Sequence, residues 1–212
     1  GKMSKSGTLG YLGSYKVPEV VLGVNAFALS AQRMNPAAKV KLVLIDSWFD
    51  PPKEAAATET LINLGCDIVT TQTDSPGPLQ ILEQNGLYGF GQGADMSAFA
   101  PQAHLTAIED IWGHYYVART KMILDGTWKS EDTWDGMKEG TVVISPYNAV
   151  VPADVVALAD EVQEGYKKGT FDIFTGPIYD QDGNLKVKEG EVMTMADLAT
   201  IDWFVKGVES AS

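Results

Sequence analysis

Apolar and polar residues are distributed along the first half of the chain with two different periods. Four short apolar runs are typical of strands buried on both faces of a parallel sheet; they are residues 8–14, 39–45, 66–71 and 87–91. Three segments with apolar residues at helical spacing lie between these runs; they are residues 18–34, 53–64 and 76–85. This alternation, with short turns between the elements, predicts a parallel sheet flanked by helices.

The second half of the chain has a less regular pattern. Short strands are expected at residues 104–108 and 141–145, and helices at residues 115–124 and 152–168. The turn signal at residues 180–183 lies between two extended pieces and predicts a hairpin. These elements fit an α/β protein but do not continue the simple alternation of the first half.

The segment from Lys39 to Asp50 is the most informative stretch of the sequence. A nearly unbroken apolar run ends abruptly and is followed by Trp48 and Phe49, and then by Asp50, which is expected to be the N-cap of the next helix. Ligands of open α/β sheets bind beyond the carboxyl ends of the strands, where these two aromatic residues lie. We therefore expect at least one of them to stack on a flat ligand, which contributes roughly 1–3 kcal/mol. The alternative is burial of both rings between lobes or helices.

Each of the four predicted strands is followed by polar or aromatic residues that a parallel sheet would bring to one edge. These residues are Tyr15, Trp48, Asp74, and Gln92 with Asp95. A carboxylate such as Asp95 accepts hydrogen bonds and could select a ring with N–H donors, such as an adenine amine. Asp74 and Asp95 could also form an acid–base pair or cap turns. Because no histidine, metal motif or nucleophile accompanies them, we favour ligand binding or turn capping over catalysis.

The composition narrows the range of partners. The formal net charge is −12, with 16 basic and 28 acidic residues, which argues against nucleic acid and anionic membranes because both favour basic patches. The single cysteine, Cys66, cannot form an intramolecular disulfide and is interpreted as a small buried apolar residue.

No cofactor or metal is expected from the sequence. The glycines at residues 10–13 and 89–93 lack the helix start or the lysine of nucleotide-phosphate motifs, so we interpret them as sites of close backbone packing. His104 and His114 do not have the spacing of a metal site.

Motifs spread over nearly the whole chain resemble the basic membrane protein family, the substrate-binding proteins of purine or nucleoside ABC importers. The motifs are Gly-Tyr-Leu-Gly-Ser at 10–14, Pro-Glu-Val at 18–20, Asn-Pro at 35–36, Asp-Ser-Trp-Phe-Asp-Pro at 46–51, Gly-Cys-Asp-Ile-Val at 65–69, Thr-Asp-Ser at 73–75, Gly-Ala-Asp-Met at 93–96, Leu-Asp-Gly-Thr-Trp at 124–128 and Phe-Thr-Gly-Pro-Ile at 174–178. The resemblance implies a two-lobed, periplasmic-binding-protein type I-like fold that captures a purine without catalysis. It also implies an ABC permease as partner and a periplasmic location or a cell-surface lipoprotein.

The resemblance assigns roles to particular residues. It places base stacking on Trp48 and recognition of polar ligand groups on Asp95. Many nucleoside-binding members carry a lysine a few residues after a Thr-Ser pair; here the pair is Thr106-Ala107, and residues 108–112 contain no lysine. A bare base such as adenine is therefore expected in preference to a nucleoside. The expected ligand-binding set is Tyr15, Trp48, Phe49, Asp74, Gln92 and Asp95.

The resemblance also implies a division of the chain and an incomplete site. Roughly a hundred residues of a first lobe are expected to precede this sequence. The expected parts are a first-lobe end or linker at 1–6, a second lobe at 7–98, a segment returning to the first lobe at 99–140, and a C-terminal segment crossing between lobes at 141–212. The segment from Leu105 to Leu124 is expected to lack sheet partners, exposing the apolar side chains of Ile108, Ile111, Tyr116 and Ile123. The first lobe, or another copy of this chain, would then cover it.

Two further classes of function stay open on the sequence. A sensor or regulatory domain of the periplasmic-binding-protein type could use the same pocket for a small purine ligand. An enzyme acting on sugars or nucleosides is a more distant third.

Overall fold

The structure, a computed structural model, describes residues 1–211. The strands are β1 (Thr8–Gly13), β2 (Lys39–Leu44), β3 (Ile68–Gln72), β4 (Tyr88–Gly93), β5 (His104–Asp110), β6 (Val142–Ile144), β7 (Ile178–Tyr179), β8 (Leu185–Val187) and β9 (Val208–Ser210). The helices are α1 (Pro18–Met34), α2 (Pro51–Asn63), α3 (Gly77–Gln84), α4 (Gly113–Leu124), α5 (Ala153–Lys168) and α6 (Met195–Ala199). The elements predicted from the sequence all occur, with ends that differ by a few residues.

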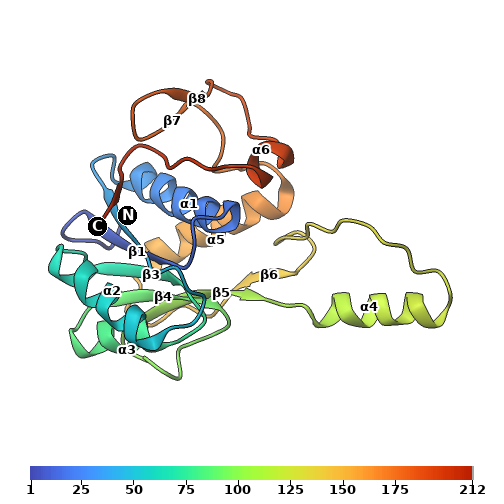
Figure 1. Ribbon diagram of the computed structural model, residues 1–212, viewed down its shortest axis with the longest axis horizontal. Helices are drawn as coiled ribbons and strands as arrows, with labels where there is room; N and C mark the ends of the chain where they lie inside the picture. Colours follow the sequence, from blue (N-terminus) through green and yellow to red (C-terminus); the bar gives the residue numbers. More distant parts are fainter. Residues whose placement is uncertain (212) are drawn as a thin grey trace.

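Seven strands form one sheet in the order β6-β5-β4-β3-β1-β2-β9. All neighbouring strands in it are parallel except the β5–β6 pair, which is antiparallel. Helix α1 covers one face of the sheet, and α2 and α3 cover the other (Figure 1). The predicted fold class, a parallel α/β sheet flanked by helices, is confirmed.

The core occupies both faces of the sheet, as β1 illustrates. Leu9 and Tyr11 belong to the cluster packed against α1, whereas Leu12 belongs to the cluster packed against α2 and α3, as the alternation of side chains along a strand requires. Cys66 lies in the second cluster, and burial raises the pKa of its thiol to about 12. Its predicted role as a small buried apolar residue is confirmed.

The glycines of β4 permit close packing of neighbouring elements. A Cβ atom on Gly89 would lie 2.7 Å from both the carbonyl oxygen of Val69 and the side chain of Leu82. Gly93 has a φ of +75°, a conformation that glycine adopts at little cost. The packing interpretation of this glycine-rich stretch is therefore confirmed.

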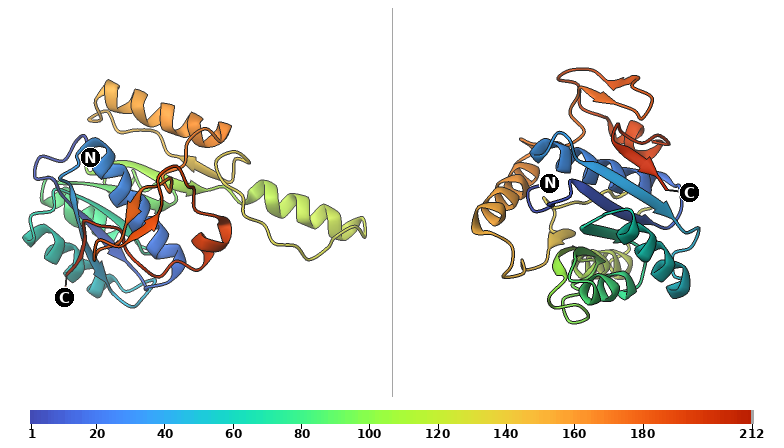
Figure 2. Two further views of the ribbon diagram at one scale, coloured as in Figure 1. Left: turned by 90° about the horizontal axis from the view of Figure 1, so that it is seen from above. Right: turned by 90° about the vertical axis from the view of Figure 1, so that its left-hand side faces the viewer.

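An arm formed by residues 111–141 protrudes from the body of the molecule, carrying α4 (Figures 1 and 2). Within the described part of the chain, α4 has no buried residue. The exposed large apolar residues of the arm and of the strand leading into it are Ile108, Ile111, Trp112, Tyr116, Val117, Ile123, Leu124, Trp128 and Trp134. Exposed apolar surface of this extent is typical of interaction surfaces, so we expect the arm to contact a partner.

The structure corrects one expectation about this region. β5 pairs with β4 on one side and with β6 on the other, so the first part of the segment from Leu105 to Leu124 has sheet partners after all. The reason is that the chain returns from the arm through β6, which covers the edge of β5. The division of the rest of the chain into lobes stays a prediction.

The C-terminal third packs around the body. Helix α5 lies on the same side of the sheet as α1 (Figure 1). β7 and β8 form the predicted hairpin, whose turn is held by Asp180. β9 extends the sheet beyond β2, where Glu209 pairs with Lys39 and Lys41, and these two bonds lower its pKa to about 2. No helix between residues 1 and 211 combines the length and apolar content needed to cross a bilayer.

Candidate ligand-binding site

The strand order defines a crevice at the carboxyl edge of the sheet. The chain leaves β1 on one side to form β2, and then returns to the other side of β1 to form β3. The carboxyl ends of β1 and β3 therefore flank the topological switch point, where ligands of open α/β sheets bind. Ser14 and Tyr15 follow β1 at this edge, and Thr73 and Asp74 follow β3.

The loop after β2 reaches across this switch point. Asp46 has a φ of +52°, a left-handed conformation that aspartate tolerates better than most residues, and its N–H donates to the carbonyl of Ser14 at 2.9 Å. Two residues later, the carbonyl of Trp48 accepts a hydrogen bond from the N–H of Asp74 at 2.9 Å. Because β1 lies between β2 and β3, this bond places Trp48 over the end of β1.

Trp48 and Tyr15 form an aromatic pair at the crevice. Their ring centroids are 5.7 Å apart and the ring planes are tilted by 59°. Trp48 is 38% exposed, so part of the indole is open to a ligand, and Phe49 is 61% exposed. Burial of the two rings between helices of this chain, one of the alternatives from the sequence, is therefore excluded. Stacking of a ligand on either ring stays a prediction.

Gln92 and Asp95 lie at the carboxyl end of β4, beyond β3. An oxygen of Asp95 accepts the N–H of Ser97 at 2.8 Å, and hydrogen bonds from Ser97 lower the pKa of the carboxyl below its usual range. Asp95 thus caps a turn, which is one of the two roles left open by the sequence. Its side chain is 41% exposed, so the ionised carboxylate is also accessible as an acceptor.

His104, at the start of β5, lies behind Asp95. It is 1% exposed, and its Nε2 is 3.9 Å from Asp95 Oδ1 and has no hydrogen-bond partner among residues 1–211. Burial lowers the pKa of the imidazole, and the carboxylates of Asp95 and Glu109 oppose part of this shift. The ring is therefore held neutral at a position where a proton would create a new ion pair.

We expect the stability of the protein to fall at mildly acidic pH because of His104. Its pKa in the folded state lies below the unfolded value, so the unfolded chain binds the proton more readily. The contribution of neutral His104 to the free energy of unfolding is complete above about pH 6.5, the pKa of histidine in the unfolded chain. It declines as the pH drops below that value. Urea unfolding between about pH 7.5 and 5.5 should show this slope, which His104→Gln should reduce and His114→Gln should leave intact. An unchanged slope in His104→Gln would contradict the assignment.

Sequence reasoning missed the polar groups buried beneath the crevice. Tyr11 donates its hydroxyl to Gln72 Oε1 at 2.6 Å, and burial raises the pKa of the phenol. Glu54 is fully buried next to Ser75. The only available signal for Glu54 was its position in the first turn of α2, where a carboxylate can reach back to the N-cap, and that position does not reveal burial.

The carboxyl edge of the sheet presents a flat aromatic surface surrounded by hydrogen-bond acceptors. Such a set suits a planar ligand with N–H donors. No group of three or more His, Cys, Asp or Glu side chains within the described sequence is placed to hold a metal ion.

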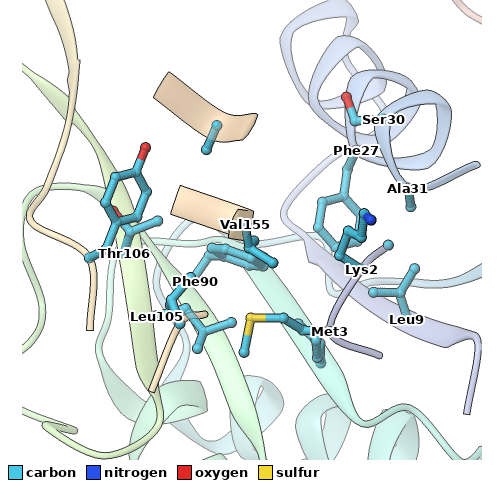
Figure 3. A pocket seen from close by; sticks show the side chains of 15 residues that line it. Lys2, Met3, Leu9, Phe27, Ser30, Ala31, Phe90, Leu105, Thr106 and Val155 are labelled. Atoms are coloured by element: carbon cyan, nitrogen blue, oxygen red, sulfur yellow. The ribbon is translucent and has the colours of Figure 1, made fainter. Parts of the chain in front are cut away.

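A separate cavity of about 270 Å³ lies between α1 and α5 on the face of the sheet (Figure 3). Its lining is mainly apolar, with Phe27 on the side of α1, Phe90 and Leu105 on the sheet, and Thr106 at one side. Thr106 donates its hydroxyl to the carbonyl of Ser145 at 2.7 Å. This cavity offers few polar groups to the edge of a heterocycle and lies away from the residues predicted to bind ligand.

A family model for ABC transporter substrate-binding proteins of the PnrA-like type, named Bmp, matches residues 1–171. The chain belongs to the Bmp family. This confirms the resemblance found in the sequence to a family of ABC transporter substrate-binding proteins.

Two curated relatives match nearly the whole chain of this Bmp protein. It is 48% identical over 208 residues to a purine-binding protein of Brucella abortus, covering 98% of this chain and 59% of the relative. It is 27% identical over 209 residues to a putative ABC transporter glucose-binding protein of Haloferax volcanii, covering 99% of this chain and 51% of the relative. The chain thus spans little more than half the length of these relatives.

Solved structures share the fold of this Bmp chain. An ABC transporter solute-binding protein from Conexibacter woesei has a TM-score of 0.65 at 20% identity, covering 79% of this chain and 57% of that structure. A transcriptional activator of the comK gene from Bacillus halodurans has a TM-score of 0.69 at 19% identity, covering 79% of this chain and 58% of that structure. At this level of identity the similarity shows the fold alone.

Proposed function

We propose that the protein is the solute-binding component of an ABC importer and that it binds a purine base, with adenine preferred, at the carboxyl edge of the sheet. The observation that carries the proposal is the position of Trp48, held over the end of β1 beside Tyr15 with part of its indole exposed. The 48% identity to a purine-binding protein supports the class of ligand. Binding of adenine to the full-length gene product, measured by calorimetry, tests it.

The geometry favours a heterocycle with polar edges. Stacking on indole accepts any flat ring, so discrimination has to come from the acceptors around it. Asp74 follows β3 and is tied through its N–H to Trp48, while Asp95 and Gln92 lie one strand further along. We infer that these side chains accept hydrogen bonds from ring and exocyclic N–H groups, and that Phe49 closes one side of the site.

The exposed arm supports a second lobe as the element that completes the site. Two-lobed binding proteins close over their ligand, so that both faces of a flat base leave water. The arm leaves the sheet at the carboxyl end of β5, on the side where the crevice opens. We infer that it packs against another α/β lobe, and that the assembled protein works with a permease outside the cytoplasm, in the periplasm or as a cell-surface lipoprotein.

Adenine is expected to bind at least as tightly as adenosine. Residues 108–112, which follow Thr106 and Ala107, include no lysine that could donate hydrogen bonds to ribose hydroxyl groups. Each ligand hydroxyl buried without a partner costs roughly 1–3 kcal/mol. Competition calorimetry with the two ligands on the full-length gene product tests this, and a clear preference for adenosine would reject the selectivity while leaving purine binding intact.

A further inference from the structure

Glu54 occupies an unusual position for a carboxylate. It lies in the first turn of α2 and is 0% exposed, and no lysine, arginine or histidine within residues 1–211 forms an ion pair with it. One oxygen accepts the backbone N–H of Asp50 at 3.0 Å, and the other accepts the hydroxyl of Ser75 in a very short contact. Burying a carboxylate is costly unless hydrogen bonds compensate it, so these two bonds decide whether the arrangement is stable.

These two hydrogen bonds connect the loops that carry the proposed ligand contacts. Asp50 ends the loop that presents Trp48, and it also caps α2 by accepting the N–H of Lys53 at 3.1 Å. Ser75 directly follows Asp74, and its Oγ accepts the N–H of Gly77 at 3.2 Å, where α3 begins. Glu54 therefore bridges the start of α2 and the start of α3.

A second link joins the same two loops closer to the ligand. It is the hydrogen bond from the N–H of Asp74 to the carbonyl of Trp48, at 2.9 Å. The loops are thus fixed at two points, by a backbone bond at the crevice and by the Glu54 carboxylate in the interior. If either link were lost, the loops could rotate relative to each other about the remaining link.

We propose that Glu54 is a positioning residue that holds Trp48 and Asp74 in the geometry required for the ligand. It does not contact the ligand itself, because it is fully buried beneath the loops. We call the two hydrogen bonds that Glu54 makes with Asp50 and Ser75 the brace. The proposal rests on the proposed function, since it holds that the brace serves purine binding. Binding sites depend on such supporting shells, which fix the side chains that touch the ligand.

The chemistry of the brace defines informative variants. Glutamine at this position can accept the N–H of Asp50 through its oxygen and donate to Ser75 Oγ through its nitrogen, so Glu54→Gln should preserve the bridge. Glu54→Ala removes both bonds. Ser75→Ala leaves the bond between Glu54 and Asp50, and removes the bond to Glu54 together with the one that Ser75 Oγ accepts from the N–H of Gly77. Thr58→Ala is the matched control, because Thr58 is also fully buried in α2 and, among residues 1–211, its hydroxyl bonds only to the carbonyl of Glu54, at 2.7 Å.

Hydrogen exchange and ligand binding test the proposal together, on the full-length gene product. In Glu54→Ala and Ser75→Ala, exchange of the Asp74 amide without ligand should accelerate about tenfold, and adenine affinity should fall about tenfold, as expected when a buried hydrogen bond is lost. Glu54→Gln should stay close to the parent protein in both measurements. Thr58→Ala should lower the midpoint of thermal unfolding without changing either.

The outcomes separate this proposal from the function on which it rests. Unchanged Asp74 exchange in both Glu54→Ala and Ser75→Ala would overturn the brace. Equal losses of adenine affinity in Thr58→Ala and Ser75→Ala would show that Glu54 only stabilises the fold in general, and would also overturn the proposal. If the parent protein binds no purine, the proposed function fails, while the exchange data still decide whether Glu54 holds the two loops.

Discussion

Replacing Trp48 by alanine is expected to weaken adenine binding by about 5- to 150-fold, the equivalent of roughly 1–3 kcal/mol of lost stacking. Trp48 lies over the end of β1, where its backbone carbonyl accepts the N–H of Asp74 and its indole ring lies beside Tyr15. The substitution removes the ring and leaves the backbone bond in place, so the loop should keep its path. Calorimetry on the full-length gene product measures the effect directly.

A phenylalanine at the same position provides the control. Trp48→Phe keeps an aromatic face and should retain most of the affinity. The chain has five tryptophans, so ligand-induced quenching is assigned to Trp48 by its loss in Trp48→Phe. Adenine binding of parental strength in Trp48→Ala would show that the base stacks elsewhere.

The 212-residue chain on its own is expected to bind adenine weakly and to self-associate. A base stacked on Trp48 alone keeps one face in water, and loss of the second stacking surface costs roughly 1–3 kcal/mol, or about 5- to 150-fold in affinity. The arm meanwhile exposes Ile123 at 63% and Leu124 at 80%. Such a surface favours contact with another copy of the chain when no second lobe covers it.

Charged substitutions on the arm test the association. Sedimentation velocity of the 212-residue chain should show dimers or larger species, and the double change Ile123→Lys with Leu124→Lys should shift the population toward monomer. The matched control is Lys121→Gln, which alters charge on the same helix without removing apolar surface. A monomeric, well-folded chain with micromolar or tighter affinity for adenine would contradict both the site and the proposed need for a second lobe.

Local patterns in the sequence were sufficient to predict the elements that form the crevice. The apolar run of β2 ends where the polar residues begin, and Asp50 caps α2 as expected, accepting the N–H of Lys53. The alternation of strands and helices fixed the parallel sheet, which in turn brings the ends of β1 to β4 to one edge. Periodicity and capping depend on neighbouring residues, so the sequence displays them directly.

Features that depend on distant residues could not be predicted in this way. The bond between Asp74 and Trp48 joins loops 26 residues apart, a separation that no local pattern encodes. Glu54 looks like an ordinary first-turn carboxylate until Ser75 is seen beside it. β5 was expected to lack sheet partners because the return of the chain through β6 is visible only in three dimensions.

A crystal structure of the full-length gene product with adenine tests the central claim most directly. Our account predicts that the base lies against the indole of Trp48 at the carboxyl ends of β1 and β3, with its N–H groups directed to Asp74 or Asp95. A base bound in the cavity between α1 and α5, or anywhere out of contact with Trp48, would contradict it.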